Sequence, residues 1–103
     1  MKPVTVVARV VAKPEAVAAL RSELMKLLVP TRAEPGCLEY RLHQDMTDPT
    51  LFLFYENWAS MECLQQHLES AHFAAYLEAS AGLIADKTVH LMTEQQQGFD
   101  LCG

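Results

Sequence analysis

The 103 residues predict an α+β domain of the ferredoxin-like class, a split β-α-β arrangement with an antiparallel sheet. Its length sets an expectation of one domain. Half of its residues are hydrophobic, which is too apolar for a disordered chain. Segments with the periodicity of strands and of helices follow one another in the order β-α-β-β-α-β. We therefore expect two helices on one face of a four-stranded sheet.

Composition argues against several classes of partner. Eight basic and 13 acidic residues give a formal net charge of −5, and the sequence has no basic run, so nucleic acid is not an expected partner. No apolar run approaches the roughly 20 residues of a membrane span. Cys37, Cys63 and Cys102 are an odd set without a C-x-x-C pair, which disfavours a disulfide framework or structural zinc and favours a reducing cytoplasm.

The first half of the chain predicts a strand, a helix and a turn. Residues 4–12 are rich in β-branched valine, which suits a strand. Pro14 follows at a position compatible with the first turn of a helix. Leucines then recur at helical spacing, and we expect this helix to end near Pro30. Glu34-Pro35-Gly36 predicts a turn.

Two further strands are expected over residues 37–44 and 51–58. The first alternates, with Leu38, Tyr40 and Leu42 on one side and polar residues on the other. The second is rich in aromatic residues but barely alternates, so both of its faces are apolar.

The second half of the chain predicts a helical region and a last strand. Ser60 is a good N-cap for a helix, and Ser70 is expected to cap a second segment whose apolar side includes Phe73 and Tyr76. Gly82 is a plausible helix end. Residues 87–93 alternate as a strand, so we place the domain at residues 1–93 and a polar C-terminal tail at residues 94–103.

The sheet has more apolar surface than two helices can cover. Leu51, Leu53 and Tyr55 point opposite to Phe52 and Phe54, and the first strand has valines on both sides. A broad apolar face left in water usually marks an interface. We expect a homodimer through this sheet face, the alternative being that the tail or loops cover it.

Short motifs resemble the antibiotic biosynthesis monooxygenase family. They are E-P-G-C-L-E-Y at residues 34–40, the pair Glu56 and Trp58, then His67, then His72-Phe73, and the resemblance spans roughly Val4 to Thr93. It implies a dimeric ferredoxin-like α+β barrel. Members of the family include cofactor-independent oxygenases of quinols and polycyclic phenols. Others degrade haem, and one branch processes a bacterial signalling molecule.

His67 and Glu56 are the candidate catalytic residues. His67 lies on the apolar stripe of its helix, so it should face a pocket between the helices and the sheet, where a neutral imidazole can accept a phenolic proton. Glu56 is expected on the buried face of its strand and could orient His67. The alternative is a structural histidine bonded to a carboxylate such as Glu56. The candidate substrate-binding residues are Trp58, Tyr40, Phe54, His72, Phe73 and Tyr76. For Trp58 and Tyr40 the alternative is simple packing, and His72 and Phe73 could form a lid over the pocket.

We expect neither a metal nor a built-in cofactor. On one continuous helix, His67 and His72 would lie about 140° apart, so they would not share a face. The sequence also has no H-E-x-x-H, flavin or nicotinamide motif. The expected reaction partners are a small aromatic substrate and O₂.

Other functions stay open at this point. Haem-degrading relatives carry an asparagine where this chain has Ala8, which cannot donate a side-chain hydrogen bond. An isomerase of the signalling-molecule type, or a dimer that binds a small ligand without turning it over, would bind a ligand and consume no O₂.

Overall fold

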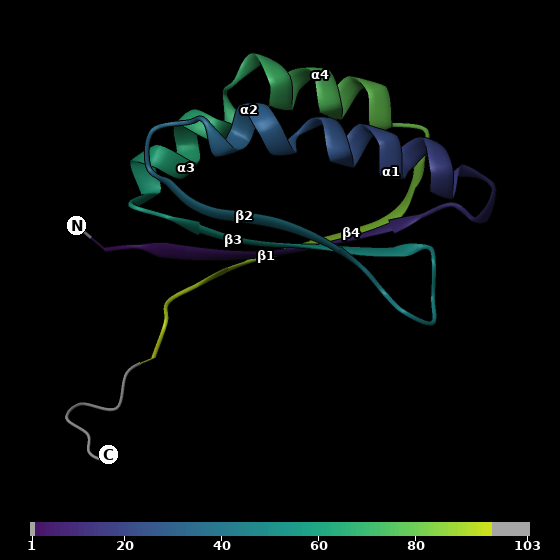
Figure 1. Ribbon diagram of the computed structural model, residues 1–103, viewed down its shortest axis with the longest axis horizontal. Coiled ribbons are helices and arrows are strands. Elements are labelled where there is room, and N and C mark those ends of the chain that lie inside the picture. The colour runs from purple at the N-terminus through teal and green to yellow at the C-terminus, as the bar shows by residue number, and fades with distance from the viewer. Residues whose placement is uncertain (1, 96–103) are drawn as a thin grey trace.

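The structure is a computed structural model that describes residues 2–95, and it confirms the ferredoxin-like class. Four antiparallel strands form one sheet in the order β2-β3-β1-β4. All helices lie on one side of this sheet (Figure 1). Within the described part of the chain, no helix is long and apolar enough to cross a membrane. The elements are β1 (Val4–Ala12), η1 (Pro14–Ala16), α1 (Val17–Lys26), α2 (Leu28–Arg32), β2 (Cys37–Gln44), β3 (Leu51–Trp58), α3 (Met61–Leu68), α4 (Ala71–Ser80) and β4 (Ile84–Met92).

The two faces of the sheet differ as the sequence predicts. On β3, the side facing the helices is buried at every position, from Phe52 at 1% exposed to Trp58 at 0%. The opposite side includes Tyr55, which is 39% exposed. On β1, Val7 pairs with Tyr55 across the sheet and is only half-buried. The side of the sheet that lies away from the helices in Figure 1 therefore carries apolar side chains such as Val7 and Tyr55.

Two element boundaries differ from the prediction. The first helix does not end near Pro30, because α1 ends at Lys26 and a separate short helix, α2, contains Pro30 at its third position. The amides of a first helical turn have no partner within the helix, so proline costs nothing there. The last strand begins at Ile84, three residues before the predicted start, since Ile84 pairs with Ala12. The charged residues that follow Ile84 conceal this in the sequence.

Leu38 was wrongly predicted to share a face with Tyr40 and Leu42. The pairing of β2 with β3 shifts between Cys37 and Glu39, so Leu38 is an extra residue on β2, as in a β-bulge. Leu38 is consequently 60% exposed, whereas Tyr40 is buried. The predicted tail begins with Glu94 and Gln95, and its remaining residues, 96–103, lie outside the described residues.

Gly36 controls the connection from α2 into β2. Its φ of 82° is in the region that favours glycine, and it is the residue that completes the predicted turn. A Cβ atom at this position would collide with the Cβ and Sγ atoms of Cys63 on α3. The backbone carbonyl of Gly36 also accepts a hydrogen bond from the amide of Ala59, at 2.8 Å. The turn is therefore packed directly against the start of α3.

Replacing Gly36 by alanine should destabilise the protein by about 2 kcal/mol, because it combines an unfavourable φ with a steric collision. Urea unfolding followed by circular dichroism measures this. The matched control is Gly82→Ala, where an added Cβ atom meets nothing within 4 Å. Equal stability of the two variants would show that the turn is not constrained in this way.

Candidate active site

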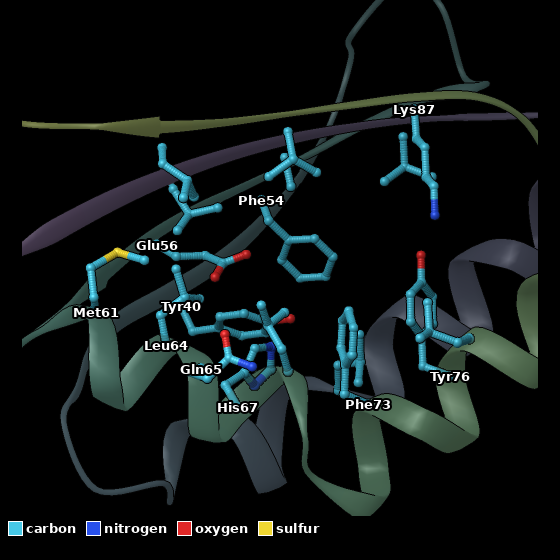
Figure 2. A pocket seen from close by; sticks show the side chains of 18 residues that line it. Tyr40, Phe54, Glu56, Met61, Leu64, Gln65, His67, Phe73, Tyr76 and Lys87 are labelled. Atoms are coloured by element: carbon cyan, nitrogen blue, oxygen red, sulfur yellow. The ribbon is translucent and has the colours of Figure 1, made fainter.

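A cavity of about 450 Å³ lies between the sheet and helices α3 and α4. Its size suits a small organic ligand. Figure 2 shows Phe54 and Glu56 projecting from the sheet toward His67, Phe73 and Tyr76 on the helices. Most of the lining is aliphatic or aromatic, with a few polar groups. The polar lining residues are Tyr40, Glu56, Gln65, His67, Tyr76 and Lys87.

His67 forms part of the cavity wall. It lies one turn after Leu64 on α3, and the helix turns both side chains toward the sheet, where His67 is 2% exposed. Its Nδ1 atom lies 2.7 Å from Oε2 of Glu34. Burial lowers the pKa of His67, and the neighbouring Glu34 opposes this only in part. The imidazole is therefore kept neutral, with one nitrogen engaged by the carboxylate.

The carboxylate that orients His67 is Glu34, so the proposed pairing of His67 with Glu56 is wrong. Glu34 belongs to the turn before β2, and in the sequence it stands out only as part of that turn and of the motif at residues 34–40. Its side chain is 13% exposed. Two signals could have identified Glu34. A buried imidazole such as that of His67 needs a hydrogen-bond partner, and the turn at Gly36 packs against α3, which carries His67.

Glu56 has a different partner, the indole of Trp58. The Nε1 atom of Trp58 donates to Oε1 of Glu56 at 2.9 Å, and Glu56 is 5% exposed. Burial raises the pKa of Glu56 to about 7, although the indole hydrogen bond works in the other direction. Glu56 can therefore gain or lose a proton near neutral pH while it lines the cavity.

His67 and His72 both contact Glu34, contrary to the expectation that they would lie on different faces. That expectation assumed one continuous helix, but α3 ends at Leu68 and α4 begins at Ala71. The Ser70 hydroxyl caps α4 by accepting from the amide of Phe73, as predicted. The break brings Nε2 of His72 within 2.7 Å of Oε2 of Glu34, the same oxygen that His67 contacts.

Glu34, His67 and His72 also provide the residue types of a metal site. One ligand atom from each lies within 4.8 Å of the other two. Nitrogen and oxygen ligands in a tetrahedral zinc site are about 3.4 Å apart, given metal–ligand distances near 2.1 Å. Both contacts of Glu34 are shorter, at 2.7 Å, which is an ordinary distance for a charge-assisted hydrogen bond. We therefore treat the three residues as a hydrogen-bonded cluster.

The predicted substrate-binding residues fall into two groups. Tyr40, Phe54, Phe73 and Tyr76 line the cavity, and Tyr40 is stacked on Phe54 with ring centroids 4.8 Å apart. Burial raises the pKa of the Tyr40 phenol far above its ordinary value, so its hydroxyl stays protonated and can donate a hydrogen bond.

Trp58 and His72 do not line this cavity. Trp58 is fully buried beneath it and packs against His67, with ring centroids 4.9 Å apart. From this position Trp58 contacts Glu56 and His67, and it does not reach a ligand in the cavity. His72 instead lines a neighbouring depression beside α1 and α4. Gln65 and Lys87 line the cavity but had no signal in the sequence, because each lies on an otherwise ordinary exposed position of its element.

Comparisons with known proteins show which family and fold this chain resembles. The sequence model described as antibiotic biosynthesis monooxygenase matches residues 3–79. A Mycobacterium tuberculosis protein named "Putative monooxygenase" is 40% identical over 74 residues, which are 72% of each chain. A crystal structure of a Pseudomonas aeruginosa protein superposes with a TM-score of 0.90 and 33% identity, over 93% of this chain and 97% of that one.

An uncharacterised Synechocystis protein is also similar, with 30% identity over 83 residues. This alignment covers 81% of the present chain but only 56% of that relative. The chain thus spans little more than half the length of this relative.

The raised pKa of Glu56 predicts a pH dependence of stability. Because burial raises the pKa of Glu56 from its ordinary 4.5 to about 7 in the folded state, the folded protein binds more protons than the unfolded chain between these pH values. The contribution of Glu56 to the free energy of unfolding should therefore be largest below pH 4.5 and fall by up to about 3 kcal/mol as the pH rises through 7. Urea unfolding of the wild type and of Glu56→Gln at pH 5 and pH 8 isolates this group. If both proteins show the same pH dependence, Glu56 is ionised throughout.

Proposed function

The chain belongs to the antibiotic biosynthesis monooxygenase family, and we propose that it is a cofactor-independent monooxygenase that oxidises a quinol or another electron-rich phenol with O₂. The observation that carries this proposal is the placement of His67. Its ring forms part of the wall of an apolar cavity, and Glu34 engages Nδ1. In the described part of the chain Nε2 makes no hydrogen bond, so it is available to a ligand.

In the proposed reaction, Nε2 of His67 accepts the proton of a phenolic hydroxyl. The phenolate transfers one electron to O₂, which gives superoxide and a phenoxyl radical. These combine at a ring carbon to form a peroxide. When its O–O bond breaks, that carbon loses its hydrogen as a proton and becomes a quinone carbonyl, and the released hydroxide takes up a proton to give water. One oxygen atom thus enters the substrate and the other is reduced to water, with the substrate as the only reductant.

The cavity residues supply what this reaction requires. A largely apolar wall suits an aromatic ring, and a bound ring would displace water from this wall. The protonated hydroxyl of Tyr40 can donate to a substrate oxygen. Glu56, with a pKa of about 7, can protonate the distal oxygen of the peroxide as the O–O bond breaks. Haem degradation has less support, because Ala8 in the cavity wall offers no side-chain hydrogen bond.

We also propose that the protein acts as a homodimer through the open face of the sheet. This face carries Val7 and Val11 on β1 and Leu53 and Tyr55 on β3, none of which is fully buried. Burying roughly 800 Å² of such surface on each partner is typical of a stable interface. A second copy would supply the matching apolar surface, because the same face occurs on each chain.

A reducing cytoplasm is the compartment that we propose. Cys37 and Cys63 are free thiols in the structure, and neither is fully buried. Free, accessible thiols persist where disulfide formation is disfavoured.

Removing the imidazole of His67 should slow the oxidation of a reduced naphthoquinone by roughly 10²-fold or more, because the general base is lost. The measurement is O₂ uptake, with His67→Ala and His67→Gln compared to the wild type. The matched control is Gln66→Ala, an exposed residue of α3 that does not line the cavity, which should keep the full rate. Thermal unfolding shows that each variant is folded, and an unchanged rate in both folded variants would remove His67 from the mechanism.

Placing a charge on the open face should separate the dimer. We expect sedimentation to give twice the chain mass of 11.5 kDa for the wild type and a single chain mass for Val7→Lys. Val29→Lys is the control, since Val29 is 79% exposed on the helical side, and it should stay dimeric. A folded wild type of 11.5 kDa at micromolar concentration would contradict the dimer.

A further inference from the structure

Three side chains, Glu34 and two histidines more than 30 residues after it, form a continuous hydrogen-bonded series that begins at the cavity. Glu34 lies in the turn before β2, His67 in the last turn of α3 and His72 in the first turn of α4. Oε2 of Glu34 lies 2.7 Å from Nδ1 of His67 and 2.7 Å from Nε2 of His72. This single oxygen atom therefore joins the two imidazoles.

Exposure increases in one direction along this series. The side chain of His67 is 2% exposed, that of Glu34 is 13% exposed and that of His72 is 26% exposed. His67 lines the cavity and not the neighbouring depression, whereas His72 lines the depression and not the cavity. The depression has a volume of about 350 Å³. The series therefore connects the cavity with this depression.

Around His67, Glu34 is the titratable group in direct hydrogen-bonding contact. The lining is mostly aliphatic and aromatic. Glu56, the other buried acid, is hydrogen-bonded to the fully buried Trp58, and an indole N–H can donate but cannot accept a proton. A proton that arrives at His67 thus has its nearest titratable neighbour in Glu34.

We propose that His67, Glu34 and His72 are a proton relay between the cavity and solvent, which rests on the proposed function of His67 as a base. In the resting state, ionised Glu34 accepts hydrogen bonds from Nδ1–H of His67 and from Nε2–H of His72. Each histidine then carries one proton, and Nε2 of His67 is the acceptor in the cavity.

The outward step moves one proton from the substrate to solvent. Afterwards, His67, Glu34 and His72 together carry the same number of protons as before. Nε2 of His67 takes the substrate proton, and the Nδ1 proton of His67 passes to Oε2 of Glu34. His72 exchanges tautomers through water, accepts the Glu34 proton at Nε2 and releases its Nδ1 proton to solvent. His67 is then left with its proton at Nε2.

The inward step returns the series to its starting state. His67 gives its Nε2 proton to the reduced oxygen in the cavity, while Nδ1 regains a proton from solvent through His72 and Glu34. Both directions are needed, because the proposed reaction first removes a proton from the substrate and later protonates an oxygen anion. In this scheme Glu34 passes the proton between the two histidines, and His72 exchanges it with water.

The relay can be tested without any substrate, by nuclear magnetic resonance of histidine labelled with ¹⁵N. The quantity measured is the rate at which the Nδ1 proton of His67 exchanges with water in the wild type, His72→Ala and the control His43→Ala. The relay predicts several-fold slower exchange in His72→Ala and no change in His43→Ala. If His72 only shields Glu34, its removal opens the cluster to water, and exchange becomes faster. Equal or faster exchange in His72→Ala would therefore overturn the relay.

A second measurement uses the proposed reaction. His72→Ala should oxidise reduced naphthoquinone more slowly than the wild type in weakly buffered solution, and added imidazole should restore the rate by replacing the missing side chain. The wild type and His43→Ala should not respond to imidazole. A loss of rate that imidazole does not restore would contradict the relay. If the wild type itself consumes no O₂, the proposed function fails, and the exchange rates still decide whether the relay exists.

Discussion

One carboxylate oxygen links the three segments that carry Glu34, His67 and His72. Oε2 of Glu34 contacts both His67 and His72, and so it ties the turn before β2 to the end of α3 and the start of α4. A carboxylate in this position is favourable only because two nitrogen donors satisfy it, since a nearly buried charge without partners is costly. The turn geometry at Gly36 and the cap at Ser70 bring these partners into place.

Burial prepares two polar groups of the cavity for different steps, because it disfavours the charged form of each. The burial of His67 lowers its pKa and keeps the imidazole neutral, whereas burial raises the pKa of Glu56 to about 7. One group is thus prepared to accept a proton, and the other can deliver one. Trp58 contributes indirectly, because its indole holds Glu56 and its ring packs against His67. A largely apolar wall strengthens each of these interactions by excluding water.

The two faces of the sheet differ because the helices cover only one of them. The helices cover one face and leave room for a cavity beneath α3 and α4 (Figures 1 and 2). The opposite face has no helix, although its strands carry valine, leucine and tyrosine. An apolar surface of this kind suits association with a second copy. Chemistry on the covered face and association on the open face can therefore coexist without competing for residues.

The sequence by itself determined the element order, the strand faces and the general place of His67, because period-two and helical patterns state which side chains share a face. It also located the caps at Ser60 and Ser70, since a cap is a local interaction. The partner of His67 was decided only by tertiary structure. Glu34 is 33 residues away from His67, and no local pattern distinguishes it from Glu56. The meeting of His67 with His72 likewise depends on where α3 breaks and on what packs against that break, which are properties of the folded chain.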